Sequence, residues 1–216
     1  MMKNEQDNLI RNILAIGGLI LIFLVPYFYA NDTTSLVPAV LLLLFFIPTF
    51  FLYSSVDERK FILAVLFIAA IAEGMNVGFG AYNYLGTNEV PQWVLIGWCC
   101  TAWSLLTLNK MIKPNQDRNK TLAVIIVLFA IYAVFISHSL TGFLLNSIIV
   151  SAIMFATETK SFNIFLIAVA FGMVIEFSGV FLFGAWSYAV GPDLSNLGAM
   201  YTFVYFIASL ISKYEL

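Results

Sequence analysis

Long apolar runs, separated by short polar or charged segments, are the feature that most restricts what this chain can fold into. Eight runs occur, at about residues 9–30, 36–53, 61–79, 92–108, 121–136, 140–156, 162–183 and 197–211. A helix needs about 20 mainly apolar residues to cross the hydrocarbon core of a bilayer. The pattern therefore predicts an all-α, polytopic membrane protein with about eight transmembrane helices.

Composition supports this interpretation. The 216 residues are 62% hydrophobic and only 10% charged, whereas a soluble domain carries about 25% charged residues. The net charge is -2, and the chain has no basic stripe of the kind that binds nucleic acid. We therefore expect a protein integral to a membrane, with no nucleic-acid partner.

The basic residues give an orientation. In the eight-helix assignment every Lys and Arg falls on the same side of the membrane: Lys3, Arg11, Arg59, Lys60, Lys110, Lys113, Arg118, Lys120, Lys160 and Lys213. Short cytoplasmic loops carry an excess of Lys and Arg. The distribution predicts that both termini are cytoplasmic.

Two segments of the chain are related in sequence. Residues 79–84 read Phe-Gly-Ala-Tyr-Asn-Tyr, and residues 183–188 read Phe-Gly-Ala-Trp-Ser-Tyr, an offset of 104 residues. A glutamate precedes each segment inside an apolar run, Glu73 in the first case and Glu176 in the second.

The same offset carries the second apolar run onto the sixth and the fourth onto the eighth. Four helices are an even number, so both halves have the same orientation. We therefore predict two parallel four-helix repeats, residues 1–110 and 111–216, related by an axis along the membrane normal. Some transporters built from such repeats bind their ligand at the repeat interface.

A carboxyl group inside hydrocarbon is costly, so it is a candidate functional group by default. Glu73 and Glu176 sit at similar depths, toward the outer side, and should line one cavity or two related ones. A carboxyl group in a dry pocket tends to keep its proton and can then act as a proton donor. We predict these two residues as the catalytic pair.

Polar and aromatic residues near the glutamates are candidates for substrate binding: Asn76, Tyr82, Tyr84, Trp98, Trp186 and Tyr188. Aromatic faces attract a cation. An acidic proton donor beside an aromatic wall therefore suits protonation of an alkene, which generates a carbocation. A site within the membrane also suits an apolar polyene or membrane lipid as substrate.

Simpler interpretations stay open at this stage. The glutamates could hydrogen-bond Asn146, Ser147 or Ser178 and hold helices together, and the aromatic residues could form an interfacial belt. The sequence thus allows three classes of protein: an isoprenoid-modifying enzyme, a small proton-coupled transporter, and a non-catalytic membrane subunit or lipid-binding scaffold.

No metal or other cofactor is expected. The only histidine, His138, lies in a predicted outer turn without nearby ligands. Cys99 and Cys100 are adjacent within an apolar run, and vicinal cysteines fit ordinary disulfide geometry poorly. We expect both to be small core residues. The chain also has no Walker loop and no dinucleotide fingerprint.

The glutamate motif resembles that of membrane carotenoid-biosynthesis proteins of the carotenoid hydratase type. Their motif sets a Glu on a helix ahead of a Phe-Gly-x-Tyr-x-Tyr segment. The matching residues in the first half are Glu73, Phe79, Gly80, Tyr82 and Tyr84, and those in the second half are Glu176, Phe183, Gly184, Trp186 and Tyr188.

The chain is also distantly similar to integral-membrane lycopene cyclases, which are small, multi-span and built from repeats. The resemblance covers about a dozen residues in each half. It implies a lyase-type addition of water, or ring closure, at a terminal isoprenoid double bond, without a metal or redox cofactor. It further implies a place in a prokaryotic cell membrane.

Overall fold

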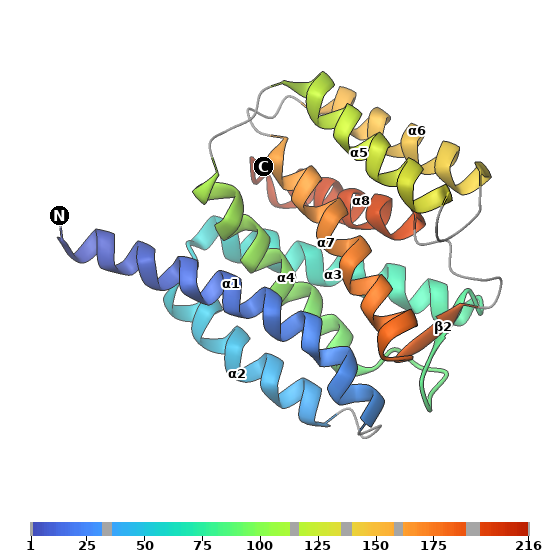
Figure 1. Cartoon of the computed structure of the whole chain (residues 1–216). Coiled ribbons are helices and arrows are strands. Elements are labelled where there is room, and N and C mark those ends of the chain that lie inside the picture. The colour runs from blue at the N-terminus through green and yellow to red at the C-terminus, as the bar shows by residue number, and fades with distance from the viewer. Residues whose placement is uncertain are drawn as a thin grey trace.

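The structure is a computed structural model that describes residues 2–31, 36–112, 117–134, 140–157, 162–188 and 195–215 (Figure 1). Residues 32–35, 137–139 and 189–194, which belong to the polar segments between predicted helices, lie outside the described residues, and so does His138. The same holds for residues 113–116 and 158–161 of two predicted charged loops.

Eight α-helices occupy the described residues, one at each apolar run, which confirms the predicted all-α class. They are α1 (Met2–Asn31), α2 (Leu36–Leu52), α3 (Val56–Gly78), α4 (Gln92–Met111), α5 (Arg118–Tyr132), α6 (Leu140–Ala156), α7 (Asn163–Phe177) and α8 (Ser195–Ser212).

Three helical segments in the described part of the chain are long and apolar enough to cross a membrane: Asp7–Asn31, Val56–Gly78 and Asn163–Leu182. Large apolar side chains also point outward along the helices, with Leu44 68%, Phe67 62% and Ile148 65% exposed. Soluble monomers rarely expose contiguous apolar surface on this scale. Both features are those of a membrane protein.

The helices form a bundle with two flanking pairs. Figure 1 shows α1 and α2 on one flank, α5 and α6 on the other, and α3, α4, α7 and α8 between them. Helix α4 packs against α1, α2 and α3, while α8 packs against α3, α6 and α7. These two helices are therefore central, and α4 carries fully buried side chains such as Trp103 and Leu105.

Helix α3 begins five residues earlier than the apolar run at 61–79 suggested. Ser55 caps it: its hydroxyl accepts a hydrogen bond from the backbone N–H of Glu58, and its own N–H donates to the Glu58 side chain. This reciprocal capping box satisfies two N–H groups that the first helical turn leaves free. The Ser-x-x-Glu spacing of a capping box is visible in the sequence. The charged residues 57–60 were expected to form a loop between two helices, and this expectation is wrong because they lie in α3.

Two short strands interrupt the helical pattern and were not predicted. β1 (Tyr82–Tyr84) and β2 (Trp186–Tyr188) follow α3 and α7 and pair antiparallel. Asn83 lies opposite Ser187 at the centre of the ribbon, with Tyr82 opposite Tyr188 and Tyr84 opposite Trp186. The motif segments expected in two separate loops thus form one structure.

The end of the bundle opposite the strands is held by Glu58, whose side chain is 1% exposed. Its Oε1 accepts hydrogen bonds from Arg11 of α1 at 2.7 Å and from Lys110 of α4 at 2.8 Å. Its Oε2 accepts from the Ser55 backbone N–H at 2.6 Å. One buried carboxylate therefore joins α1, α3 and α4.

We predict that Glu58→Ala destabilises the fold by about 1–3 kcal/mol, because it leaves the partly buried Arg11 guanidinium and the Ser55 backbone N–H without an acceptor. The neighbouring Asp57 is the matched control. It pairs with Lys60 on the surface, where both side chains are more than half exposed, and such pairs contribute less than about 1 kcal/mol. Thermal unfolding in detergent measures both, and equal losses in the two variants would contradict the prediction.

Candidate carboxylate site

Residues of both strands line a cavity that also contains the two glutamates. Glu73 lies near the end of α3 and Glu176 near the end of α7, and each is only 8% exposed. The cavity measures about 60 Å³. Every sequence-predicted site residue lines it: Glu73, Asn76, Tyr82, Tyr84, Trp98, Glu176, Trp186 and Tyr188.

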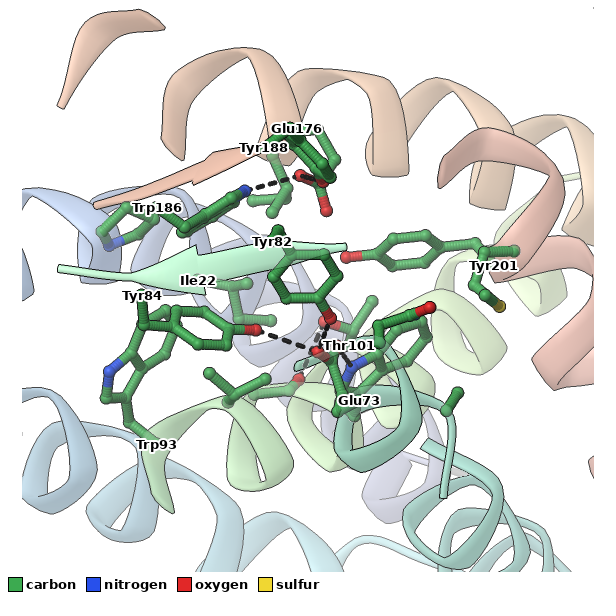
Figure 2. Close-up of a pocket in the computed structure, with 18 residues that line it drawn as sticks. Ile22, Glu73, Tyr82, Tyr84, Trp93, Thr101, Glu176, Trp186, Tyr188 and Tyr201 are labelled. Carbon is green, nitrogen blue, oxygen red and sulfur yellow. Dashed lines mark hydrogen bonds between the residues drawn. The ribbon is translucent and has the colours of Figure 1, made fainter. Parts of the chain in front are cut away.

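Glu73 accepts hydrogen bonds on both carboxyl oxygens. The hydroxyls of Tyr82 and Tyr84 donate to its Oε2, the latter at 2.9 Å, and the Trp98 indole N–H donates to its Oε1 at 2.8 Å (Figure 2). The two tyrosines come from β1 and the tryptophan comes from α4. Glu73 therefore connects the ribbon to α3 and α4.

Glu176 accepts hydrogen bonds on one oxygen. The Trp186 indole N–H donates to its Oε2 at 2.8 Å, and the Tyr188 hydroxyl donates to the same atom at 2.9 Å. Within the described ranges, the other oxygen, Oε1, has no hydrogen-bond partner. Figure 2 shows the carboxyl group of Glu176 directed into the pocket beside Trp186.

None of the three polar groups expected under the helix-packing interpretation bonds a glutamate, and among the described residues the Ser147 hydroxyl has no partner. The Asn146 amide donates to the Gly142 carbonyl at 2.6 Å. The Ser178 hydroxyl donates to the Ile175 carbonyl at 2.8 Å. The glutamates are instead held by aromatic donors, most of them on the ribbon.

Two cavity-lining aromatic residues were not predicted from the sequence. Tyr201 of α8 stacks on Trp98, with ring centroids 4.4 Å apart and an interplanar angle of 29°. Trp93 of α4 contacts Tyr84 and Trp186 at centroid distances of 6.1 and 6.3 Å. Tyr201 follows Trp98 by 103 residues, the same separation as between the two glutamates, and this spacing could have identified it.

The helix carrying Glu176 ends in a π-helical turn, η2 (Ser178–Leu182). A π-turn adds a residue to a helix and often occurs at functional sites. The extra residue matches a sequence difference: Phe79 follows Glu73 by six positions, whereas Phe183 follows Glu176 by seven. The turn thus absorbs one inserted residue and still delivers Trp186 and Tyr188 to Glu176.

Gly179 in this turn lets the Trp186 ring lie directly against the helix. A Cβ at position 179 would come within 2.0 Å of the Trp186 ring. Only a residue without a side chain leaves room for the indole in the position from which its N–H donates to Glu176.

We predict that Gly179→Ala displaces Trp186 and costs about 1–3 kcal/mol of stability, the usual range for overpacking a buried site. Gly74→Ala is the matched control, because a Cβ at position 74 meets nothing within 4 Å. Melting temperature and tryptophan fluorescence should change in the first variant and not in the second. An unchanged Gly179→Ala protein would show that the contact is not required.

No metal-binding group is found in the described part of the chain, where no three His, Cys, Asp or Glu side chains converge. Cys99 and Cys100 are free thiols buried in the core, as expected. The residues of the cavity supply carboxyl groups, phenol hydroxyls and indole rings. Such groups can transfer protons and can stabilise a positive charge.

Comparison with models of protein families, with curated proteins and with solved structures finds no match to this chain. The resemblance to the carotenoid hydratases and lycopene cyclases therefore rests on the motif residues alone. The function must be inferred from the geometry and chemistry of the site.

Proposed function

We propose that this protein is an integral membrane enzyme that acts on an apolar isoprenoid or carotenoid-like lipid by acid-initiated hydration or cyclisation. The observation that carries the proposal is the convergence of two buried carboxyl groups on one aromatic-lined cavity. Proton transfer by a positioned side chain contributes about 10²–10⁴-fold to a rate. No cofactor is needed for such a step.

The aromatic walls suit the intermediate of this reaction. Protonation of a terminal alkene leaves a positive charge on carbon, and an indole or phenol face attracts a cation. Trp98 and Tyr201 form a stacked pair at the cavity, and Trp93 and Trp186 line it as well. The cation would then be captured by water, in hydration, or by a second double bond, in cyclisation.

The size of the cavity restricts how substrate enters. A buried water needs at least about 10–15 Å³ of such space, so a cavity of about 60 Å³ holds a few waters and not an isoprenoid end group. We propose that side chains of the cavity wall move aside when the end of the lipid enters. Closure around substrate is a common way to exclude bulk water from a reaction.

We further propose eight transmembrane helices with cytoplasmic termini, in a prokaryotic cell membrane. The position of the chain ends supports this topology: Figure 1 shows the start of α1 and the end of α8 at the end of the bundle opposite the strands. The ion-pair cluster of Arg11, Glu58 and Lys110 also belongs to that end. Cytoplasmic segments are the ones enriched in basic residues.

The proposal of two parallel repeats has its own support. Tyr82 and Trp186 occupy equivalent positions in the two motif segments, and so do Tyr84 and Tyr188. In the ribbon Tyr82 pairs with Tyr188 and Tyr84 pairs with Trp186. A two-fold axis through the centre of the ribbon produces this pattern. Trp98 and Tyr201, the same 103 residues apart as the glutamates, stack on each other. The contacts of α2 with α4 also recur between α6 and α8.

Cysteine labelling of intact cells tests the topology. Asn88→Cys, in the exposed loop beside β1, should react with a membrane-impermeant maleimide, whereas Asp57→Cys should react only after the membrane is permeabilised. The native cysteines are buried and give little background. Labelling of position 57 from outside would contradict the proposed orientation.

Expression in a bacterial host that accumulates acyclic carotenoids tests the activity. We expect a new product that differs from the substrate by the mass of one water, or a cyclic isomer of equal mass. The Glu73→Gln/Glu176→Gln double variant should lose the conversion, because neither amide can act as an acid. Chromatography with mass spectrometry detects both products.

The two other classes of protein give different outcomes in this experiment. Full conversion by the double variant would show that neither glutamate is required for the reaction. No conversion by the wild-type chain, together with proton uptake into vesicles, would favour the proton-coupled transporter. No conversion and no uptake would favour the subunit or scaffold.

A further inference from the structure

The two glutamates accept hydrogen bonds in different ways, and this difference assigns them different tasks. We propose that Glu176 carries the transferable proton on its Oε1, while Glu73 is a positioning residue that stays an ionised acceptor. The use of that proton in a reaction rests on the proposed function. The assignment of the proton does not, because it depends only on the donors around each carboxyl group.

Both oxygens of Glu73 already accept hydrogen bonds, so a proton on either one weakens an existing bond. Its Oε1 receives the Trp98 indole N–H, a group that donates and never accepts, and a proton on Oε1 would leave that N–H with only a carboxyl hydroxyl as its acceptor. Its Oε2 receives both the Tyr82 and Tyr84 hydroxyls. A proton on Oε2 would force one tyrosine to turn from donor to acceptor and would leave the phenol hydrogen without a partner in a buried site, which is unfavourable.

Glu176 has room for a proton. Its two donors, the Trp186 indole N–H and the Tyr188 hydroxyl, share Oε2. Its Oε1 is left without a partner among the described residues, and the carboxyl group is directed into the cavity (Figure 2). Protonating Oε1 therefore reverses no existing hydrogen bond and places the acidic hydrogen where substrate would arrive.

The reaction step balances with water as the second reactant. The Oε1–H bond of Glu176 breaks, the alkene π electrons form a new C–H bond, and the neighbouring carbon becomes cationic. A water molecule adds through its oxygen to that carbon, and the proton it loses returns to the Glu176 carboxylate. In cyclisation the internal double bond attacks instead, and the proton lost from the ring returns to the same oxygen.

In this scheme Glu73 does not exchange a proton. Its three donors hold Tyr82 and Tyr84 of the ribbon and Trp98 of α4 in place. Trp98 in turn stacks on Tyr201. Glu73 therefore positions the aromatic wall, and its fixed negative charge lies in the cavity where the carbocation forms.

Infrared spectroscopy of the purified protein at neutral pH tests the assignment without any substrate. A protonated carboxyl group gives a C=O stretching band that shifts in D₂O and is separate from the bands of carboxylates. We expect this band in the wild-type protein and in Glu73→Gln, and we expect it to be lost in Glu176→Gln. Persistence of the band in Glu176→Gln would overturn the proposal.

Thermal stability gives a second, independent readout. In Glu176→Gln the amide oxygen can replace Oε2 for both donors, and the NH₂ group replaces Oε1, so we expect a melting temperature within about 2 °C of wild type. In Glu73→Gln the NH₂ group must replace one of the two oxygens, so it faces either the Trp98 N–H or the two tyrosine hydroxyls, and at least one of the three hydrogen bonds is lost or reversed. We expect a fall of about 4–10 °C.

The outcomes separate this inference from the proposed function. A larger fall in melting temperature for Glu176→Gln than for Glu73→Gln would count against the assignment. If Glu73→Gln cannot be purified, the infrared band of Glu176→Gln is enough to test the assignment. The glutamine in this variant keeps the hydrogen bonds with Trp186 and Tyr188, so the protein should fold. If the wild-type protein shows the band, Glu176→Gln lacks it and no lipid is converted, the proposed enzymatic function is wrong. The assignment of the proton to Glu176 then still holds.

Discussion

The structure depends on hydrogen bonds between two buried carboxyl groups and the aromatic side chains that surround them. A carboxylate taken out of water costs several kcal/mol unless hydrogen-bond donors replace its hydration. Here tyrosine hydroxyls and indole N–H groups do so, and most of them come from the two three-residue strands. An isolated ribbon of this length would not be stable in water. The hydrogen bonds to the glutamates therefore stabilise the strands, and the same bonds replace the water that the buried carboxyl groups lose.

Buried glutamates at the two ends of the bundle have hydrogen-bond partners of different character. At one end Glu58 binds two cationic side chains from α1 and α4, which makes a fixed ion cluster. At the other end the glutamates have only neutral donors. A cation beside Glu176 would hold it ionised. With neutral partners, a carboxyl group in an apolar setting can keep a proton and release it.

The two motif segments are similar in sequence, yet their surroundings are not equivalent. Helix α1 packs on α4 and contacts η2, whereas α5 packs on α6 and α7. The π-turn inserts one residue after Glu176, and Trp186 stands where the first segment has Tyr82. These differences leave Glu73 with hydrogen bonds on both carboxyl oxygens and Glu176 with hydrogen bonds on one, among the residues described. The proposed division into a proton donor and a positioning residue depends on this asymmetry.

Much of this protein can be predicted from its sequence, because the relevant signals are local. Apolar runs of helical length define the eight helices, and a glutamate inside such a run is conspicuous wherever it occurs. For this reason Glu73, Glu176 and the aromatic residues of their motifs could be predicted as one site, and the structure places all of them around one cavity. The capping box at Ser55 is equally local and could have been found.

How these residues act on one another is set by tertiary packing. The ribbon pairs Tyr82 with Tyr188 across more than a hundred residues, and three-residue strands carry no periodic signal that would reveal it. Tyr201 reaches the cavity by stacking on a tryptophan from another helix. Which carboxyl oxygen receives which donor depends on the packing of α3, α4 and α7 around the ribbon. Hydrogen-bond direction is a property of atoms in contact, and no local pattern in the chain encodes it.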